Sequence, residues 1–117
     1  MKLGVSGYRG FKDYHQFYRE MTSFIEEHGK PDEIVSGGAK GADAMAERYA
    51  REENIPLLVY RPDWNKHGKK AGILRNGDIV TRSTHLIAFP SPHGKGTQDA
   101  IRRAKRQGKP CKTIWIQ

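Results

Sequence analysis

Five short β-rich runs alternate with four helical patterns along the chain, and this alternation restricts the fold more than any other feature. Most of the β-rich runs are continuous apolar segments, as is typical of strands that are covered on both faces. Strands that alternate with helices form a parallel sheet with helices on both sides, joined by right-handed crossovers. We therefore expect a Rossmann-like α/β fold of three layers. The expected strands are residues 2–6, 33–36, 56–61, 84–89 and 112–116.

The helical patterns differ in strength. In the first, apolar residues recur at the i, i+3, i+4, i+7 spacing of one buried helix face, with Asp13 placed as N-cap and Gly29 as C-terminal stop. The second is equally amphipathic. The third is interrupted by Gly77, which weakens its continuity. The expected helices cover residues 14 to about 25, 42 to about 52, 71–82, and 97–108.

Composition limits the class of protein. A chain of 117 residues with 36% hydrophobic and 29% charged residues is expected to form one ordered domain, residues 1–117, around one core. No apolar run approaches the roughly 18 to 20 residues of a membrane span, and no signal-peptide region follows Met1. We therefore expect a cytoplasmic protein without a membrane partner. The single Cys111 offers neither a disulfide nor a zinc cluster, so no metal is expected.

The basic residues gather in the loops that follow the expected strands. The net charge of +8 favours an anionic partner, and both nucleotides and nucleic acids satisfy it. In open parallel sheets, ligands bind outside the carboxyl ends of the strands. We therefore expect one strongly positive rim of the sheet. The basic residues of these loops are Arg9, Lys12, Lys40, Arg61, Lys66, Lys69, Lys70 and Lys95, and Arg75 follows just inside the next helix.

Two of these loops are rich in glycine and lead into helices. The stretch "SGGAKGAD", residues 36–43, would let backbone N–H groups approach an anion at a helix N-terminus. Its spacing is that of neither the P-loop nor the dinucleotide fingerprint, so a tight strand-to-helix connection explains it equally well. The stretch "GKGTQDAI" places Gly94, Gly96 and Thr97 before the last helix, where Thr97 either caps the helix or binds a phosphate. Together the two loops predict a phosphate-binding cleft.

Three segments carry a resemblance to a known family: "SGGAKGADAMAERYA", "DWNKHGKKAGILRN" and "LIAFPSPHGKGTQDAIRRA". In order and spacing they resemble the YspA-like branch of the SLOG superfamily, which includes the Lonely Guy enzymes and the DNA-processing protein A domain. The resemblance covers nearly the whole chain and implies the strand order 3-2-1-4-5. It also implies a nucleotide or nucleotide-derived ligand between the two glycine-rich loops, with no cofactor.

The loop positions and the resemblance together give a set of candidate ligand-binding residues. They are Ser6, Gly7, Arg9, Ser36, Gly37, Gly38, Gly41, Asp43, Trp64, Lys70, Arg75, Asn76, Gly94, Gly96 and Thr97.

Catalytic residues are harder to assign. The Lonely Guy pattern P-G-G-x-G-T-x-x-E is matched here by "PHGKGTQDA", with His93 in place of a glycine and Ala100 in place of the glutamate. Asp99 lies one residue early, about 100° around the helix from that position. Arg75 resembles the arginine of the family. The catalytic candidates are therefore Arg75, Asp43 and Asp99, although each aspartate is also explained as a first-turn residue that stabilises its helix dipole.

Three functional hypotheses follow. The leading one is a domain that binds or senses a nucleotide or nucleotide-derived small molecule. The second is a phosphoribohydrolase or nucleotide N-glycosidase, and the third is a DNA-binding module, which the basic segment 102–109 would suit unless it is only a solvated helix end. Trp64 either stacks on a base or anchors its own loop. A second copy of the chain, forming a homodimer, is a further candidate partner.

Overall fold

The computed structural model, which describes residues 1–117, contains a five-stranded parallel sheet. Its strands are β1 (Lys2–Gly7), β2 (Glu33–Ser36), β3 (Leu57–Val59), β4 (His85–Phe89) and β5 (Cys111–Thr113). They lie in the order β3-β2-β1-β4-β5, and every neighbouring pair is parallel. The order reverses at β1, so the loops after β1 and β4 leave the same edge side by side, where such sheets bind ligands. The expected fold and strand order are confirmed.

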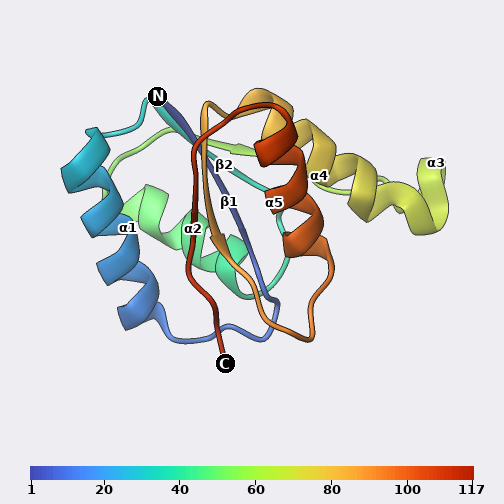
Figure 1. Cartoon of the computed structure of the whole chain (residues 1–117), viewed down its shortest axis with the longest axis horizontal. Helices are drawn as coiled ribbons and strands as arrows, with labels where there is room; N and C mark the ends of the chain where they lie inside the picture. Colours follow the sequence, from blue (N-terminus) through green and yellow to red (C-terminus); the bar gives the residue numbers. More distant parts are fainter.

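Helices cover both faces of this sheet (Figure 1). They are α1 (Tyr14–His28), α2 (Ala42–Glu52), the short α3 (Trp64–His67), the 3₁₀ turn η1 (Gly68–Lys70), α4 (Ala71–Arg82) and α5 (Gly96–Arg106). The helices α1 and α2 pack on one face, and α4 and α5 pack on the other. None of these helices has the combination of length and apolar composition needed to cross a bilayer.

Strand β4 shows how the two faces are divided. Its residues Ile87 and Phe89 belong to the core that α1 and α2 cover, whereas Leu86 and Ala88 belong to the smaller core beneath α4 and α5. All four are buried, as expected for a strand whose successive side chains point to opposite faces that are both covered. The continuous apolar run in the sequence therefore reflects burial on two sides.

The ends of α1 follow the sequence signals. The Asp13 side chain accepts a hydrogen bond from the Gln16 N–H at 3.1 Å, and Gly29 follows the last residue with a φ of 92°. Since a positive φ is strained for most L-residues, glycine is favoured at this stop. Both predicted caps are confirmed.

The bounds of several elements differ from the sequence prediction. Residues 64–70 form α3 and η1 instead of an irregular loop, and β3 covers Leu57–Val59 where a strand over residues 56–61 was expected. Helix α4 covers Ala71–Arg82 as expected, and Gly77 does not interrupt it. Strand β5 ends three residues early, yet the N–H groups of Ile114 and Ile116 still donate hydrogen bonds to β4 and to Pro90, at 2.8 and 2.7 Å. The pairing therefore continues beyond the regular strand.

Candidate functional site

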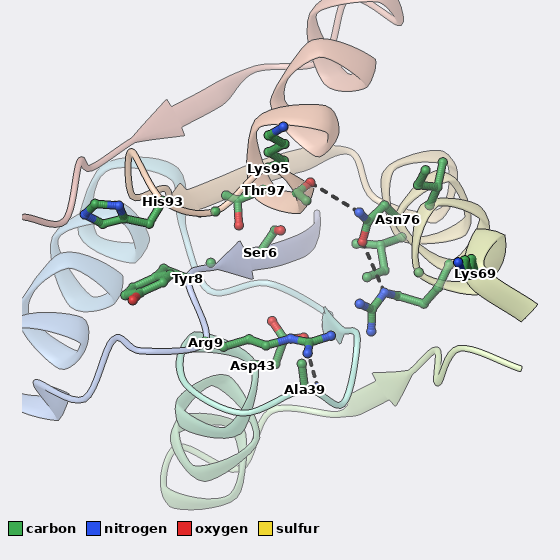
Figure 2. Close-up of a pocket in the computed structure, with 17 residues that line it drawn as sticks. Ser6, Tyr8, Arg9, Ala39, Asp43, Lys69, Asn76, His93, Lys95 and Thr97 are labelled. Carbon is green, nitrogen blue, oxygen red and sulfur yellow. Dashed lines mark hydrogen bonds between the residues drawn. The ribbon is translucent and has the colours of Figure 1, made fainter. Parts of the chain in front are cut away.

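A cleft of about 380 Å³ opens at the carboxyl ends of β1 and β4. Its walls are the loops after β1, β2 and β4 and the first half of α4 (Figure 2). The sequence-predicted residues that line it are Ser6, Gly7, Arg9, Asp43, Arg75, Asn76, Gly94, Gly96 and Thr97.

The remaining predicted residues lie elsewhere. Gly38 and Trp64 line a neighbouring cavity that shares Arg9 and Arg75 with the cleft. The residues that line neither cavity are Ser36, Gly37, Gly41 and Lys70.

The first glycine-rich loop has glycine at three positions because other parts of the protein lie against its backbone there. A Cβ on Gly37 would overlap the guanidinium of Arg75, and one on Gly38 would come within 2.6 Å of the Arg61 guanidinium. A Cβ on Gly41 would overlap the backbone of the loop after β1, and Gly38 and Gly41 have φ values of 73° and 75°. The missing side chains therefore make room for two arginines and for a close approach of backbone.

Two N–H groups of this loop are already bonded within the protein. The Gly38 N–H donates to Ser36 Oγ at 3.4 Å, and the Ala39 N–H donates to the Asp43 carboxylate at 3.1 Å. From the sequence, such groups were candidate donors to an anion. In the structure they instead fix the turn between β2 and α2.

The second glycine-rich loop leaves its helix end open. Helix α5 begins at Gly96, and no side chain caps its N-terminus, so its first N–H groups lack a capping acceptor. Thr97 and Ser6 line the wall of the cleft and are 5% and 8% exposed. No fully buried side-chain oxygen in the protein lacks a hydrogen-bond partner, so the unbonded hydroxyls of these two residues are open to the cleft. The Gln98 side chain donates to the Gly94 carbonyl at 3.0 Å and so braces the loop. The result is a group of donors that faces an open space.

Two adjacent residues of α4 connect the two glycine-rich loops. Arg75 donates to the carbonyl of Gly37 and, through Nε, to the Asn76 side-chain oxygen at 3.1 Å. The Asn76 amide in turn donates to the carbonyl of Gly96 at 3.2 Å. Figure 2 shows the two bonds of Asn76 as dashed lines along one side of the cleft. Arg75 and Asn76 therefore set the separation of the loops as well as lining the space between them.

The charges around the cleft are strongly unbalanced. Asp43 is the one carboxylate among the lining residues. Burial raises its pKa above the ordinary value of 3.8, although the bond from the Ala39 N–H and the neighbouring guanidinium of Arg75 act in the opposite direction. Burial lowers the pKa of Arg75, which as a guanidinium stays protonated near neutral pH. The cationic side chains that line the cleft are Arg9, Lys69, Arg75 and Lys95.

The other catalytic candidate lies away from the cleft. The Asp99 carboxylate forms an ion pair with Arg103 at 2.9 Å and does not line the cavity. Ala100 is 1% exposed in the core beneath α4 and α5, together with Val80 and Leu86. A glutamate at that position would therefore lie in apolar surroundings and not at the cleft. No three His, Cys, Asp or Glu side chains gather closely enough to hold a metal ion.

Sequence reasoning missed several lining residues on α4. Gly72, Ile73 and Ile79 face the cleft with Arg75 and Asn76. Positions 72, 75, 76 and 79 have the spacing of one helix face, so that face would have been found by extending the pattern from the two predicted residues. The further lining residues that were not assigned to the site are Tyr8, Ala39, Lys69, His93 and Lys95.

Comparisons with known proteins identify the family and the fold of the chain. The family model described as the YspA, cpYpsA-related SLOG family matches residues 1–67, which include the first glycine-rich loop. The chain belongs to this family. The SLOG protein is also similar to the Gene 61 protein of Mycobacterium phage D29, at 35% identity over 112 residues, covering 91% of this chain and 90% of the relative.

A solved structure of DNA processing protein A from Helicobacter pylori has the same fold. It superposes with a TM-score of 0.73 at 20% identity, and the match covers 97% of the SLOG protein. The SLOG protein spans 64% of that longer chain. The solved structure is described by its single-stranded DNA binding mode, which is a property of that protein. At this identity the likeness establishes the Rossmann-like architecture.

Proposed function

We propose that this SLOG protein binds a nucleotide or nucleotide-derived small molecule, with a phosphate group seated at the N-terminus of α5. The observation that carries the proposal is the uncapped start of α5, which opens onto a cleft with four cationic side chains and one carboxylate. A helix N-terminus carries about half a positive charge together with unpaired N–H donors, and both favour an anion.

Two hydroxyls at the wall of the cleft support a ligand more specific than a counterion. The hydroxyls of Thr97 and Ser6 are not bonded within the protein and are open to the cleft. A hydroxyl both donates and accepts hydrogen bonds, so a ligand oxygen is a suitable partner for each. The volume of about 380 Å³ also falls within the range of small-molecule sites. Hydrogen-bond donors gathered at one point suit the terminal phosphate of a small molecule better than the extended sugar-phosphate backbone of a nucleic acid.

The arrangement favours binding without glycosidic cleavage. Such cleavage needs a carboxylate placed to activate water or stabilise the developing positive charge. Asp43 is the candidate that lines the cleft, and its oxygen is engaged by the Ala39 N–H beside the Arg75 guanidinium. Its role is therefore to fix the turn between β2 and α2. The enzyme hypothesis has less support from the geometry.

The DNA-binding hypothesis also has less support. The basic segment 102–109 lies in the last turns of α5 and beyond, far along the helix from its start at the cleft. Arg102 and Arg103 in this segment pair with Asp99 at 3.7 and 2.9 Å, which offsets part of their charge. The DNA-binding mode described for the solved relative belongs to a longer protein.

Calorimetric titration with AMP and with adenosine tests the proposal. AMP is expected to bind far more tightly than adenosine, because adenosine lacks the phosphate that α5 would receive. Replacing Thr97 by Val keeps the side-chain shape and removes the hydroxyl, so AMP affinity should fall about tenfold or more, the usual effect of losing a hydrogen bond to a charged group.

Thr81→Val is the matched control, since Thr81 is exposed in the last turn of α4 and does not line the cleft. This variant should bind AMP like the parent. Equal affinities for AMP and adenosine, or equal AMP affinities in the parent and Thr97→Val, would contradict the proposal.

A further inference from the structure

A second cavity, of about 680 Å³, adjoins the cleft. Arg9, Ala39 and Arg75 line both cavities, so the two spaces adjoin at these three residues. The other residues around the second cavity are Gly38, Lys40, Arg61, Pro62 and Trp64. Four of its eight lining side chains are therefore cationic and none is acidic, which makes the cavity suitable for further phosphate.

Arg61 is held in this cavity by the first glycine-rich loop. Its Nη1 donates to the carbonyl of Gly38 at 3.3 Å, and its side chain lies across the space where a Cβ on Gly38 would be. One carbonyl leaves most of the five guanidinium donors free. The bare Gly38 thus positions a cation whose remaining donors are available to a ligand.

Trp64 gives the same cavity an aromatic face. It is the first residue of α3, whose start is fixed by a hydrogen bond from the Lys66 N–H to the Asp63 carboxylate at 3.1 Å. The Trp64 side chain is 52% exposed, so it does not anchor its segment in the core. An exposed indole beside arginines and a lysine has the composition of a site where a base stacks while cations contact phosphate.

We propose that the second cavity is a second nucleotide subsite, and that the ligand is a dinucleotide, two nucleotide units joined through phosphate. This inference rests on the proposed function, because the first unit occupies the cleft with its terminal phosphate at α5. The linking phosphate lies near Arg9 and Arg75, which border both cavities. The second base stacks on Trp64, with Arg61 and Lys40 beside it.

The test compares AMP with the 5′-phosphorylated dinucleotide pApA by calorimetry, in the parent and in Trp64→Ala. The parent should bind pApA at least about tenfold more tightly than AMP, the effect expected from one stacked base. Trp64→Ala should remove this gain and leave AMP affinity unchanged. Trp115→Ala is the matched control, since Trp115 is similarly exposed at 54% and lines neither cavity.

The outcomes separate the two proposals. If neither AMP nor pApA binds, the proposed function fails. If AMP binds and pApA binds no more tightly, or if Trp64→Ala weakens both ligands equally, the second subsite alone is refuted. A 5′-phosphorylated strand of about ten nucleotides should bind no more tightly than pApA. A large gain with length that disappears between about 50 and 200 mM salt would instead show a nucleic-acid track and overturn the dinucleotide.

Discussion

Asp43 is the ionisable carboxyl group whose burial affects the cleft most directly. It is 5% exposed, accepts the Ala39 N–H, and lies close enough to Arg75 for the two charges to influence each other. Burial nevertheless dominates and raises the pKa of Asp43. The folded protein therefore binds a proton at this site more readily than the unfolded chain does.

This difference predicts a specific dependence of stability on pH. Because the folded-state pKa of Asp43 is raised, the stability that this group contributes is present at low pH and is lost as pH rises upward from about 3.8. Asp43→Asn has no such titration. The variant should therefore gain stability relative to the parent as the pH rises above about 3.8, as measured by urea unfolding at each pH. If the stability difference between Asp43→Asn and the parent stays constant with pH, or changes in the opposite direction, the pKa of Asp43 is not raised.

Gly37 offers a second prediction at the same scale. A Cβ there would overlap Arg75 and come within 2.8 Å of the Asp43 carboxylate, although the φ of Gly37 is not in the positive region. Gly37→Ala should therefore displace Arg75 and weaken AMP binding about tenfold, the effect of one disturbed charged hydrogen bond. Gly77→Ala makes the same change in the middle of α4, where the Cβ meets the flexible end of Arg103 at 3.1 Å. That control should leave AMP affinity unchanged in the same titration.

At the scale of elements, the sequence predicted the regular structure well. Strands buried on both faces and helices with one apolar face leave distinct patterns, and these located every strand of the sheet and the four long helices. The order of the strands came from the resemblance, because the periodicity of an element does not reveal its neighbours. The helix α3 was missed because four residues are too few to show a helical period, and none of them is buried.

The candidate site was predictable only in part, for a physical reason. The second glycine-rich loop leads into a helix N-terminus and faces the cleft as expected. The glycines of the first loop instead accommodate side chains from elsewhere, Arg75 from α4 and Arg61 from the segment after β3. A glycine that admits a distant arginine and a glycine that admits a ligand look the same in sequence. Only the tertiary contacts distinguish them.

At the scale of the whole molecule, the fold brings three loops and α4 together at one edge of the sheet. The hydrogen bonds from Arg75 to Gly37 and from Asn76 to Gly96 join α4 to both glycine-rich loops. Since these bonds lie within the chain itself, they hold the cleft in shape, which lowers the cost of ordering it on binding. A preformed cleft whose one carboxylate is already hydrogen-bonded within the protein is suited to binding a ligand and not to cleaving it.

This organisation predicts that the protein does not release the base from a nucleotide. AMP incubated with a stoichiometric amount of protein should yield no adenine above the level of a protein-free control, as followed by chromatography. The physical reason is that Asp99 is paired outside the cleft and Ala100 is in the core, so neither supplies the required carboxylate. Rapid release of adenine that Asp43→Asn abolishes would make Asp43 a catalytic residue and refute the binding role.

The most direct test of the central claim is an NMR titration of ¹⁵N-labelled protein with AMP. The largest amide shifts are expected at Gly96, Thr97 and Gln98, because their N–H groups form the open start of α5. Adenosine at the same concentration should leave these three amides unchanged. Shifts confined to residues 102–109, or equal shifts with AMP and adenosine, would contradict the claim that α5 receives a phosphate.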